Sequence, residues 1–231
     1  MKLNSLHQIA ILLIVFLSTL IVNAQDNDSI KNQTLREKSY ITFNLLSPVD
    51  QLVPRWRMGY IKSINQKWKA GIEFGYGNKK LAFAVIDDDY NQVDYQLWEI
   101  RPELYYILNP SKKTQTYISA DFFYINHKDI QYFGVYYPTD EIGIHYDQAN
   151  YFRQKYGMHL KYGYFIPTGK RFGLNVFTGL GFRIRNNNYS NVINSQNQEL
   201  GIKEFNLGSF REDESANFGV DFSLGLKLFL H

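Results

Sequence analysis

The sequence predicts an all-β fold, an eight-stranded antiparallel up-and-down β-barrel that follows a cleavable signal peptide. Three observations predict it. From residue 39 onward, apolar and polar residues alternate with a period of two, which is the pattern of strands with two different faces. Short and long connections alternate between these segments, as expected when one rim of a barrel carries tight turns and the other carries loops. The first 25 residues have the composition of a secretory signal.

The N-terminal segment has the three parts of a signal peptide. A polar start with Lys2 precedes an apolar run from Ile9 to Val22, and Val22-Asn23-Ala24 is a small-residue cleavage pattern. A retained membrane anchor is the alternative, but it needs ~20 predominantly apolar residues and this run is shorter. We therefore expect a signal peptide at 1–24, a flexible polar lead at 25–38 and the barrel at 39–231.

The composition narrows the class of function. The chain has no cysteine, which excludes disulfides, thiol catalysis, cysteine-ligated zinc and a lipoprotein anchor. The net charge is only +3 with acids and bases interspersed, so no nucleic-acid partner is expected. Aromatic residues make up 16% of the chain, and together with 16 glycines and a secretory signal this is typical of barrels.

The first five strands are expected from the alternation between residues 39 and 126. Their predicted ranges are 39–46, 55–63, 67–77, 93–108 and 114–126, with weaker alternation in the first two. The connections at about 64–66 and 109–113 are short and turn-like. Those at about 47–54, 78–92 and 127–149 are longer and are expected to be loops.

The last three strands show the clearest alternation. They are expected at Tyr156–Tyr164, 171–185 and 216–230, joined by a short turn at 166–170 and a long loop at 186–215. In the final strand one face carries Phe218, Val220, Phe222, Leu224, Leu226, Leu228 and Leu230. An even number of strands places both termini at the rim with the short turns.

The apolar face of such a barrel can point outward to lipid or inward to a ligand, as in a soluble lipocalin-like carrier. The polar face mixes glycine with charges of both signs, which suits a narrow, filled lumen. These charged residues are Arg57, Glu73, Glu99, Arg101, Glu103, Asp121, His159, Lys161, Arg183, Arg185, Asp221 and Lys227. The strands also exceed the ~9–11 residues needed to cross a bilayer. We therefore expect a transmembrane β-barrel with its apolar face in lipid.

Aromatic residues near the strand ends support the same expectation. Trp56 and Trp98 fall near the long-loop ends of their strands, and Trp68 lies beside a short turn. Tyr105, Tyr106 and Tyr164 are also expected near the short turns. Two such belts are typical where a barrel meets the two membrane interfaces.

Three local motifs resemble small outer-membrane β-barrel proteins of Gram-negative bacteria whose function is unknown. They are Tyr156–Tyr164, Gly169–Leu174 and Thr178–Gly181. The last strand, ending Phe229-Leu230-His231, is similar to the C-terminal signal read by the outer-membrane insertion machinery, although that signal usually ends on an aromatic residue. The resemblance implies an OmpA- or OmpX-like barrel in the cell outer membrane. It also implies that outer-membrane lipid, lipopolysaccharide and the insertion machinery are partners.

The lumen charges could form an ion path or a plug of buried ion pairs. Buried charges are tolerated when paired, and eight strands leave no aqueous channel. We therefore expect a plug in which Glu99, Glu103 and Asp121 pair with Arg101, Arg183 and Arg185.

For every residue group considered for catalysis or metal binding, a purely structural role explains the sequence better. His159 is expected on the lumen face with no serine near it in sequence, and Gly179-Leu180-Gly181 reflects packing. The loop residues considered were His127, Asp129, Asp140, Glu141, His145 and Asp147 as a metal site, Asp87-Asp88-Asp89 as a calcium loop, and Asn186-Asn187-Asn188 as a partner contact. We expect no catalytic, cofactor-binding or metal-binding residue. The expected role is structural or one of recognition through the long loops, whose partner is unknown. The alternatives are a lipid-modifying enzyme with histidine and serine or aspartate on the outer wall, or a soluble carrier.

Overall fold

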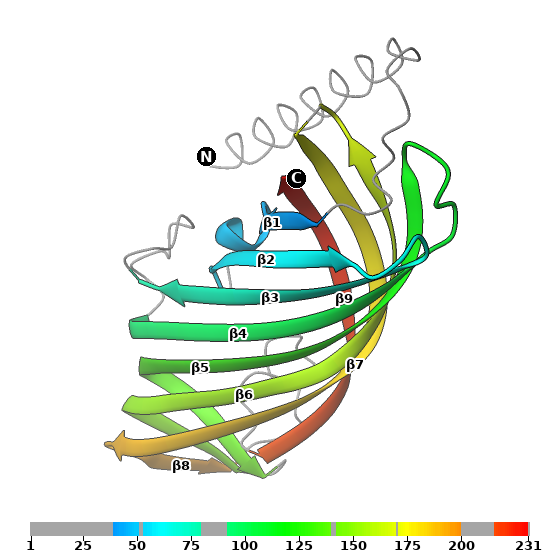
Figure 1. The fold of residues 1–231 in the computed structure, drawn as a ribbon. Coiled ribbons are helices and arrows are strands. Elements are labelled where there is room, and N and C mark those ends of the chain that lie inside the picture. Colours follow the sequence, from blue (N-terminus) through cyan, green and yellow to red (C-terminus); the bar gives the residue numbers. More distant parts are fainter. Residues whose placement is uncertain are drawn as a thin grey trace, which may run out of the picture.

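The structure is a computed structural model that describes residues 39–50, 53–79, 92–139, 142–169, 171–199 and 215–230. The expected signal peptide and polar lead fall outside these residues. The described chain is all-β and antiparallel, with one 3-10 turn (Figure 1). Its elements are β1 (Tyr40–Asn44), η1 (Ser47–Val49), β2 (Trp56–Ser63), β3 (Trp68–Asn78), β4 (Gln92–Ile107), β5 (Gln115–Thr139), β6 (Ile142–Pro167), β7 (Phe172–Ile193), β8 (Gln196–Glu199) and β9 (Ser215–Leu230).

Eight of the strands close into a ring. Each of β1 to β6 pairs with the next strand along the chain, and β7 pairs with β9. The ring closes where Ile41–Asn44 of β1 pair with Lys227–Leu230 of β9. This order confirms the expected antiparallel meander of eight strands, and β2, β3, β4 and β9 lie within one residue of their predicted ends.

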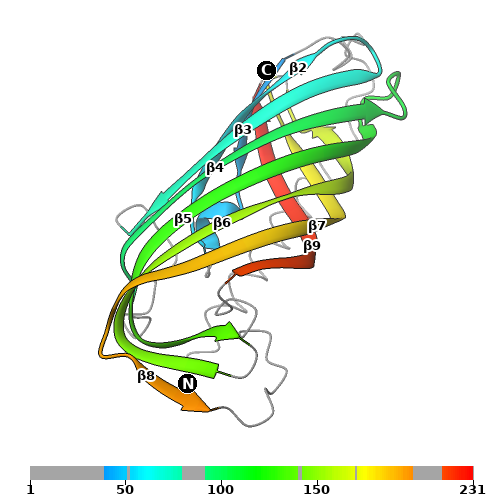
Figure 2. The same cartoon turned by 90° about the horizontal axis from the view of Figure 1, so that it is seen from below.

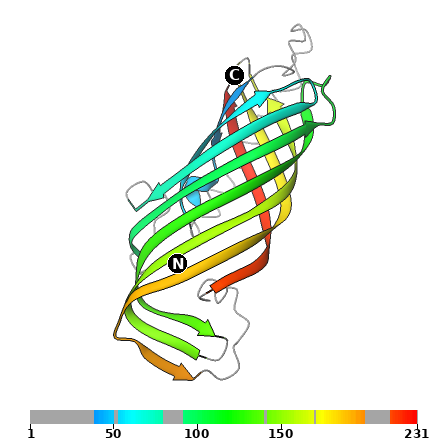
Figure 3. The same ribbon diagram turned by 60° about the horizontal axis from the view of Figure 1, so that its bottom comes forward.

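The prediction of a long loop at 127–149 is wrong, because β5 and β6 continue as paired strands from Asn126↔Gln154 to Thr139↔Ile142. The loop predicted at 186–215 is also partly wrong, since β7 runs to Ile193 and β8 adds to the edge of β6. We call residues 132–139, 142–150 and 186–199 the extension. It continues past the ends of β4 and β9 and curves away from the ring (Figures 2 and 3).

The extension escaped prediction because its inner face is tyrosine-rich and its exposed residues mix polar side chains with Phe133, Ile142 and Ile193, which weakens the hydropathy alternation. The inner cluster consists of Tyr136, Tyr146, Ala149, Tyr151 and Tyr189, and the rings of Tyr136 and Tyr189 stack at 4.5 Å. Register shifts occur after Tyr136 and after Gln148, and Phe133 and Asn191 have positive φ angles. Such irregularities bend strands and obscure a strict period of two.

The apolar face of the ring points outward and the charged face points inward, as expected from the sequence. On β9, Phe222 is 78% exposed and Leu224 is 73% exposed. Every strand of the ring contributes outward apolar residues, which we call the apolar belt. It includes Ile41, Met58, Tyr60, Ile72, Phe74, Ile100, Leu104, Ile118, Phe122, Tyr156, Leu160, Tyr162, Phe172, Leu180, Phe182, Phe218, Val220, Phe222 and Leu224.

An aromatic cluster fills the interior at the short-turn end of the ring. Its members are Tyr40, Ile61, Tyr105, Ile107, Tyr117, Phe165, Phe177 and Phe229, all buried. The assignment of Tyr105 to an outer aromatic belt is therefore wrong: Tyr105 is 1% exposed and its hydroxyl donates to Glu103 at 2.7 Å. The reason is parity, because alternation along β4 places Tyr105 on the same face as Arg101 and Glu103.

Glycines allow the inner face to pack closely, and a matched pair tests this. A Cβ on Gly181 would overlap the backbone oxygen of Met158, whereas a Cβ on Gly219 would meet nothing nearer than Arg183 Nε at 3.6 Å. We expect Gly181→Ala to lower the free energy of unfolding by about 1–3 kcal/mol, because the backbone must shift. Gly219→Ala should have no such cost. Urea titration of the protein in micelles, followed by tryptophan fluorescence, measures both; equal effects would contradict the packing role.

Candidate functional site

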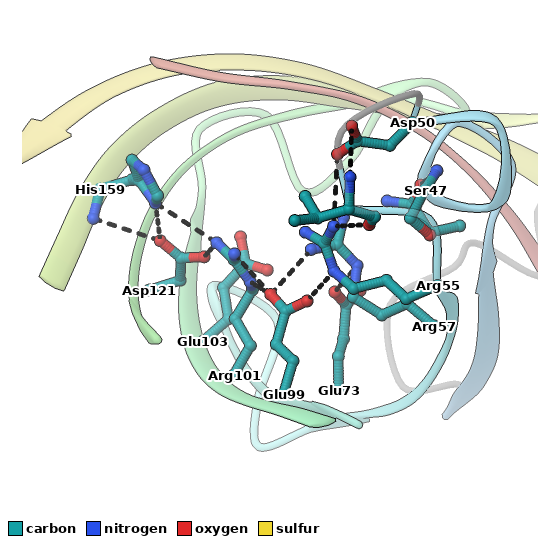
Figure 4. A network of polar contacts seen from close by, with 12 residues as sticks. Ser47, Asp50, Arg55, Arg57, Glu73, Glu99, Arg101, Glu103, Asp121 and His159 are labelled. Atoms are coloured by element: carbon teal, nitrogen blue, oxygen red, sulfur yellow. Dashed lines mark hydrogen bonds and ion pairs between the residues drawn. The ribbon is translucent and has the colours of Figure 1, made fainter. Parts of the chain in front are cut away.

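A network of buried ion pairs occupies the middle of the ring, with Glu99 of β4 at its centre (Figure 4). Glu99 is fully buried and accepts hydrogen bonds from three arginines. Arg55 Nε is one donor, Arg57 Nη1 donates at 3.2 Å, and Arg101 Nη2 donates at 2.6 Å. Alternation on β2 and β4 makes this possible, because Arg57, Glu99 and Arg101 all occupy inward positions.

Asp121 of β5 connects this centre to β6. Its carboxylate accepts from Arg101 Nη1 at 2.5 Å and pairs with Lys161 Nζ at 2.8 Å. His159 Nδ1 lies 2.9 Å from the other oxygen of Asp121, and His159 Nε2 lies 3.4 Å from Asp221. His159 is therefore held between two carboxylates on the inner face, where its sequence parity placed it.

A second group of ions lies next to the aromatic cluster. Lys227 of β9 pairs with Glu73 at 2.5 Å and with Glu103 at 3.2 Å. Glu103 also pairs with Lys161 at 3.2 Å and accepts from Ser119 at 2.6 Å. These contacts link β3, β4, β5, β6 and β9 across the interior, so the middle of the ring is filled by mutually neutralised charges.

The expected plug of ion pairs is present, but only one of its three predicted cations pairs with the predicted carboxylates. Arg101 pairs with Glu99 and Asp121 as expected. Arg183 instead pairs with Asp221 at 3.0 Å, and no ion pair joins Arg185 to Glu99, Glu103 or Asp121. Alternation along a strand identifies the residues that point inward, but it does not tell which residues of the other strands lie beside them.

The cations that replace them could have been found in part. Lys161 and Lys227 were already on the polar face and needed only the strand register to be assigned to Glu103. Arg55 opens the predicted strand 55–63 and shares the parity of Arg57, so parity alone could have placed it among the inward charges. It pairs with Asp50 at 3.3 Å as well as with Glu99.

A cavity of about 410 Å³ lies above the network, towards the long-loop end. Its walls come from the segment around η1 and from β2, β4, β5, β6, β7 and β9. Six arginines and one lysine line it, against the two carboxylates Asp50 and Asp221; these cations are Arg55, Arg57, Arg101, Arg153, Lys155, Arg183 and Arg185. The cavity is thus strongly cationic.

The arrangement gives His159 no nucleophilic serine partner. Among the described residues no serine hydrogen-bonds to it, and the hydroxyl of Ser119 is engaged by Glu103. Arg101 Nη1 lies 3.3 Å from His159 Nδ1, and the ring stacks on Phe123 at 4.7 Å. These contacts hold the imidazole inside the ring and away from the outer wall.

The other polar candidates are dispersed. His127 and Asp129 lie on the inner face of β5, where burial raises the pKa of the Asp129 carboxyl to about 8. Asp147, by contrast, accepts from Asn194 in the extension at 2.6 Å. Asp87-Asp88-Asp89, Asp140 and Glu141 fall outside the described residues. No group of three or more histidine or acidic side chains suited to a metal ion occurs in the part of the chain that the structure describes.

Two further findings bear on the class of protein. None of the helices in the described ranges is both long and apolar enough to span a bilayer. Comparisons with protein-family models, with curated proteins and with solved structures gave no match.

Proposed function

We propose that this chain is an integral β-barrel protein of the bacterial outer membrane, with a filled lumen and a non-enzymatic role in envelope structure or recognition. The observation that carries the proposal is the apolar belt, which surrounds the ring on every strand while charges fill its interior. A contiguous apolar surface of this size on a secreted protein is typical of contact with lipid or a partner. A belt that surrounds the whole ring favours lipid over a protein partner, which would cover one side.

The length of the belt supports a bilayer. On β7 its outward residues run from Phe172 to Ile184, after which Asn186, Asn188 and Ser190 continue the same face. At ~3.3 Å per residue the apolar part spans about 40 Å along the strand. A tilt of about 45° reduces this to about 28 Å, close to the apolar band of outer-membrane barrels. The extension would then stand outside the membrane.

Aromatic pairs at both limits of the belt support the same placement. Near the short turns, Trp68 packs on Tyr106 at 5.0 Å. Near the long loops, Trp98 packs on Tyr124 at 5.2 Å. Tryptophan and tyrosine prefer the interface between headgroups and hydrocarbon, where the ring is apolar and its polar atom reaches water.

The filled interior favours a structural or recognition role over transport. The ion-pair network occupies the middle of the ring, and the aromatic cluster occupies its short-turn end. A soluble carrier of an apolar ligand would line its interior cavity with apolar residues, whereas charged residues dominate the cavity here. Outside the membrane, the extension offers a surface for a partner whose identity is open. The signal-like start and the C-terminal strand suit export and handling by the insertion machinery, with lipopolysaccharide as neighbour.

Membrane extraction tests the proposal. The protein expressed in a Gram-negative host should sediment with outer membranes, resist extraction by urea and carbonate, and dissolve in detergent. On gels it should run faster unheated than boiled, because a closed barrel stays compact in detergent. Recovery in the soluble periplasmic fraction without heat-modifiable mobility would refute the proposal.

A further inference from the structure

The cationic cavity keeps a surplus of positive charge at the end facing the extension. Deeper in the ring, Glu99 neutralises Arg55, Arg57 and Arg101. At the other end of the cavity, two cations share the carboxylate of Asp221. Lys155 Nζ lies 2.7 Å from it and Arg183 Nη1 lies 3.0 Å from it. The Lys155 and Arg183 side chains remain 22% and 25% exposed, so both can still meet a ligand.

Arg153 is the cation that contributes most clearly to this surplus of positive charge. It extends from β6 into the cavity and is 7% exposed. Its Nε has no hydrogen-bond partner, and no carboxylate of the described residues forms a close ion pair with it, although Asp129 lies within electrostatic range. A buried guanidinium without a close ion pair is costly to keep. Its position therefore calls for an anion in the cavity.

The cavity opens sideways through the wall of the ring. It is lined by Ser223 of β9 and also by the outward residues Phe222 and Leu224. Four consecutive residues of β9, Asp221 to Leu224, line the cavity, so the cavity borders the backbone edge of that strand. That edge is open because β1 ends at Asn44, and among the described strands residues 215–225 of β9 pair with β7 alone.

The opening lies level with the apolar belt, since Phe222 pairs with Leu180 of β7. A backbone edge without strand partners is tolerated at membrane depth only where it borders a polar, water-filled space. The cationic cavity supplies such a space behind the edge. An apolar chain could thus lie along Phe222 and Leu224 while its polar head reaches the cavity.

We propose that the cavity binds the phosphoryl group of an anionic amphiphile that enters through the opening between β1 and β9. Guanidinium groups match phosphate oxygens with paired, charge-assisted hydrogen bonds, and Arg153, Arg183 and Lys155 provide donors from two adjacent strands. The apolar mouth favours a lipid phosphate over free phosphate. The lipid source rests on the proposed membrane location, whereas the phosphate site itself does not.

Binding of phosphatidic acid to the chain isolated from cells in dodecyl maltoside micelles tests this. Calorimetric titration should give saturable binding near one lipid per protein, while phosphatidylcholine with the same acyl chains should bind at least tenfold more weakly. Arg153→Gln should weaken phosphatidic acid binding about tenfold, since one charge-assisted contact is lost. Lys128→Gln, which removes the same charge from an exposed position on β5, should leave it unchanged.

Two comparisons separate the sources of phosphate. Leu224→Asp at the mouth should weaken phosphatidic acid binding and leave inorganic phosphate binding unaltered. Inorganic phosphate binding as tightly as the lipid would overturn the lipid source. No preference for phosphatidic acid over phosphatidylcholine, or an R153Q variant that binds like the parent, would overturn the site. Failure of the membrane proposal would appear separately, as a chain soluble without detergent whose phosphate binding can still be measured in buffer.

Discussion

Glu99→Gln is expected to lower the free energy of unfolding by about 3–5 kcal/mol. Glu99 is fully buried and neutralises three guanidinium groups. The glutamine amide keeps the shape of the carboxylate but removes its charge. Its NH2 group, a hydrogen-bond donor, would face guanidinium groups that are donors too. Three buried cations then share the remaining carboxylates. Urea titration in lipid vesicles, with tryptophan fluorescence as the signal, measures the loss.

Asp50→Asn is the matched control for Glu99. Asp50 pairs with the same Arg55, at 3.3 Å, but its side chain is 34% exposed. Water therefore screens the pair, and the expected cost is at most about 1 kcal/mol. If Glu99→Gln cost no more than Asp50→Asn, the interior would be hydrated and the filled lumen would be wrong.

Leu180→Lys is expected to destabilise the protein in lipid vesicles by about 2–4 kcal/mol. Leu180 faces outward on β7, is 57% exposed and lies near the middle of the apolar belt. A lysine there must hold its charge in hydrocarbon or bend to reach the interface. The same urea titration in vesicles provides the measurement.

Asn188→Lys on the same face of the same strand lies beyond the belt, in the extension. An exposed lysine in water should change the free energy of unfolding by less than about 0.5 kcal/mol. For a soluble ring both substitutions would be nearly neutral, because Leu180 would already face water. Equal, small effects would therefore contradict the membrane location.

The sequence was sufficient for the ring because its strands have two chemically different faces. On β9, alternation from Phe218 to Leu230 defined both the strand and the face that points outward. The same rule failed in the extension, where Tyr136, Tyr146 and Tyr189 face inward and the exposed residues are both polar and apolar. Tyrosine is common on both kinds of surface, so hydropathy does not separate the faces there.

The site was predictable in kind but not in detail. Parity placed Glu99, Asp121 and His159 in the interior, and the expectation of paired charges followed from burial alone. Which cation meets which carboxylate depends on register and shear, which bring Lys227 to Glu103 across 124 positions of sequence. The side opening depends on the early end of β1 at Asn44, and no local pattern marks that end.

Site-directed spin labelling of β7 in lipid vesicles tests the central claim most directly. The chain has no cysteine, so single cysteines can be introduced without removing native ones. The even positions from 174 to 190 all face outward and include no glycine. Labels at 174–184 should collide with oxygen dissolved in lipid and be shielded from a water-soluble nickel complex, with a switch to nickel access at 186–190. Nickel access at every one of these positions, with no switch, would show a water-exposed strand and contradict the membrane barrel.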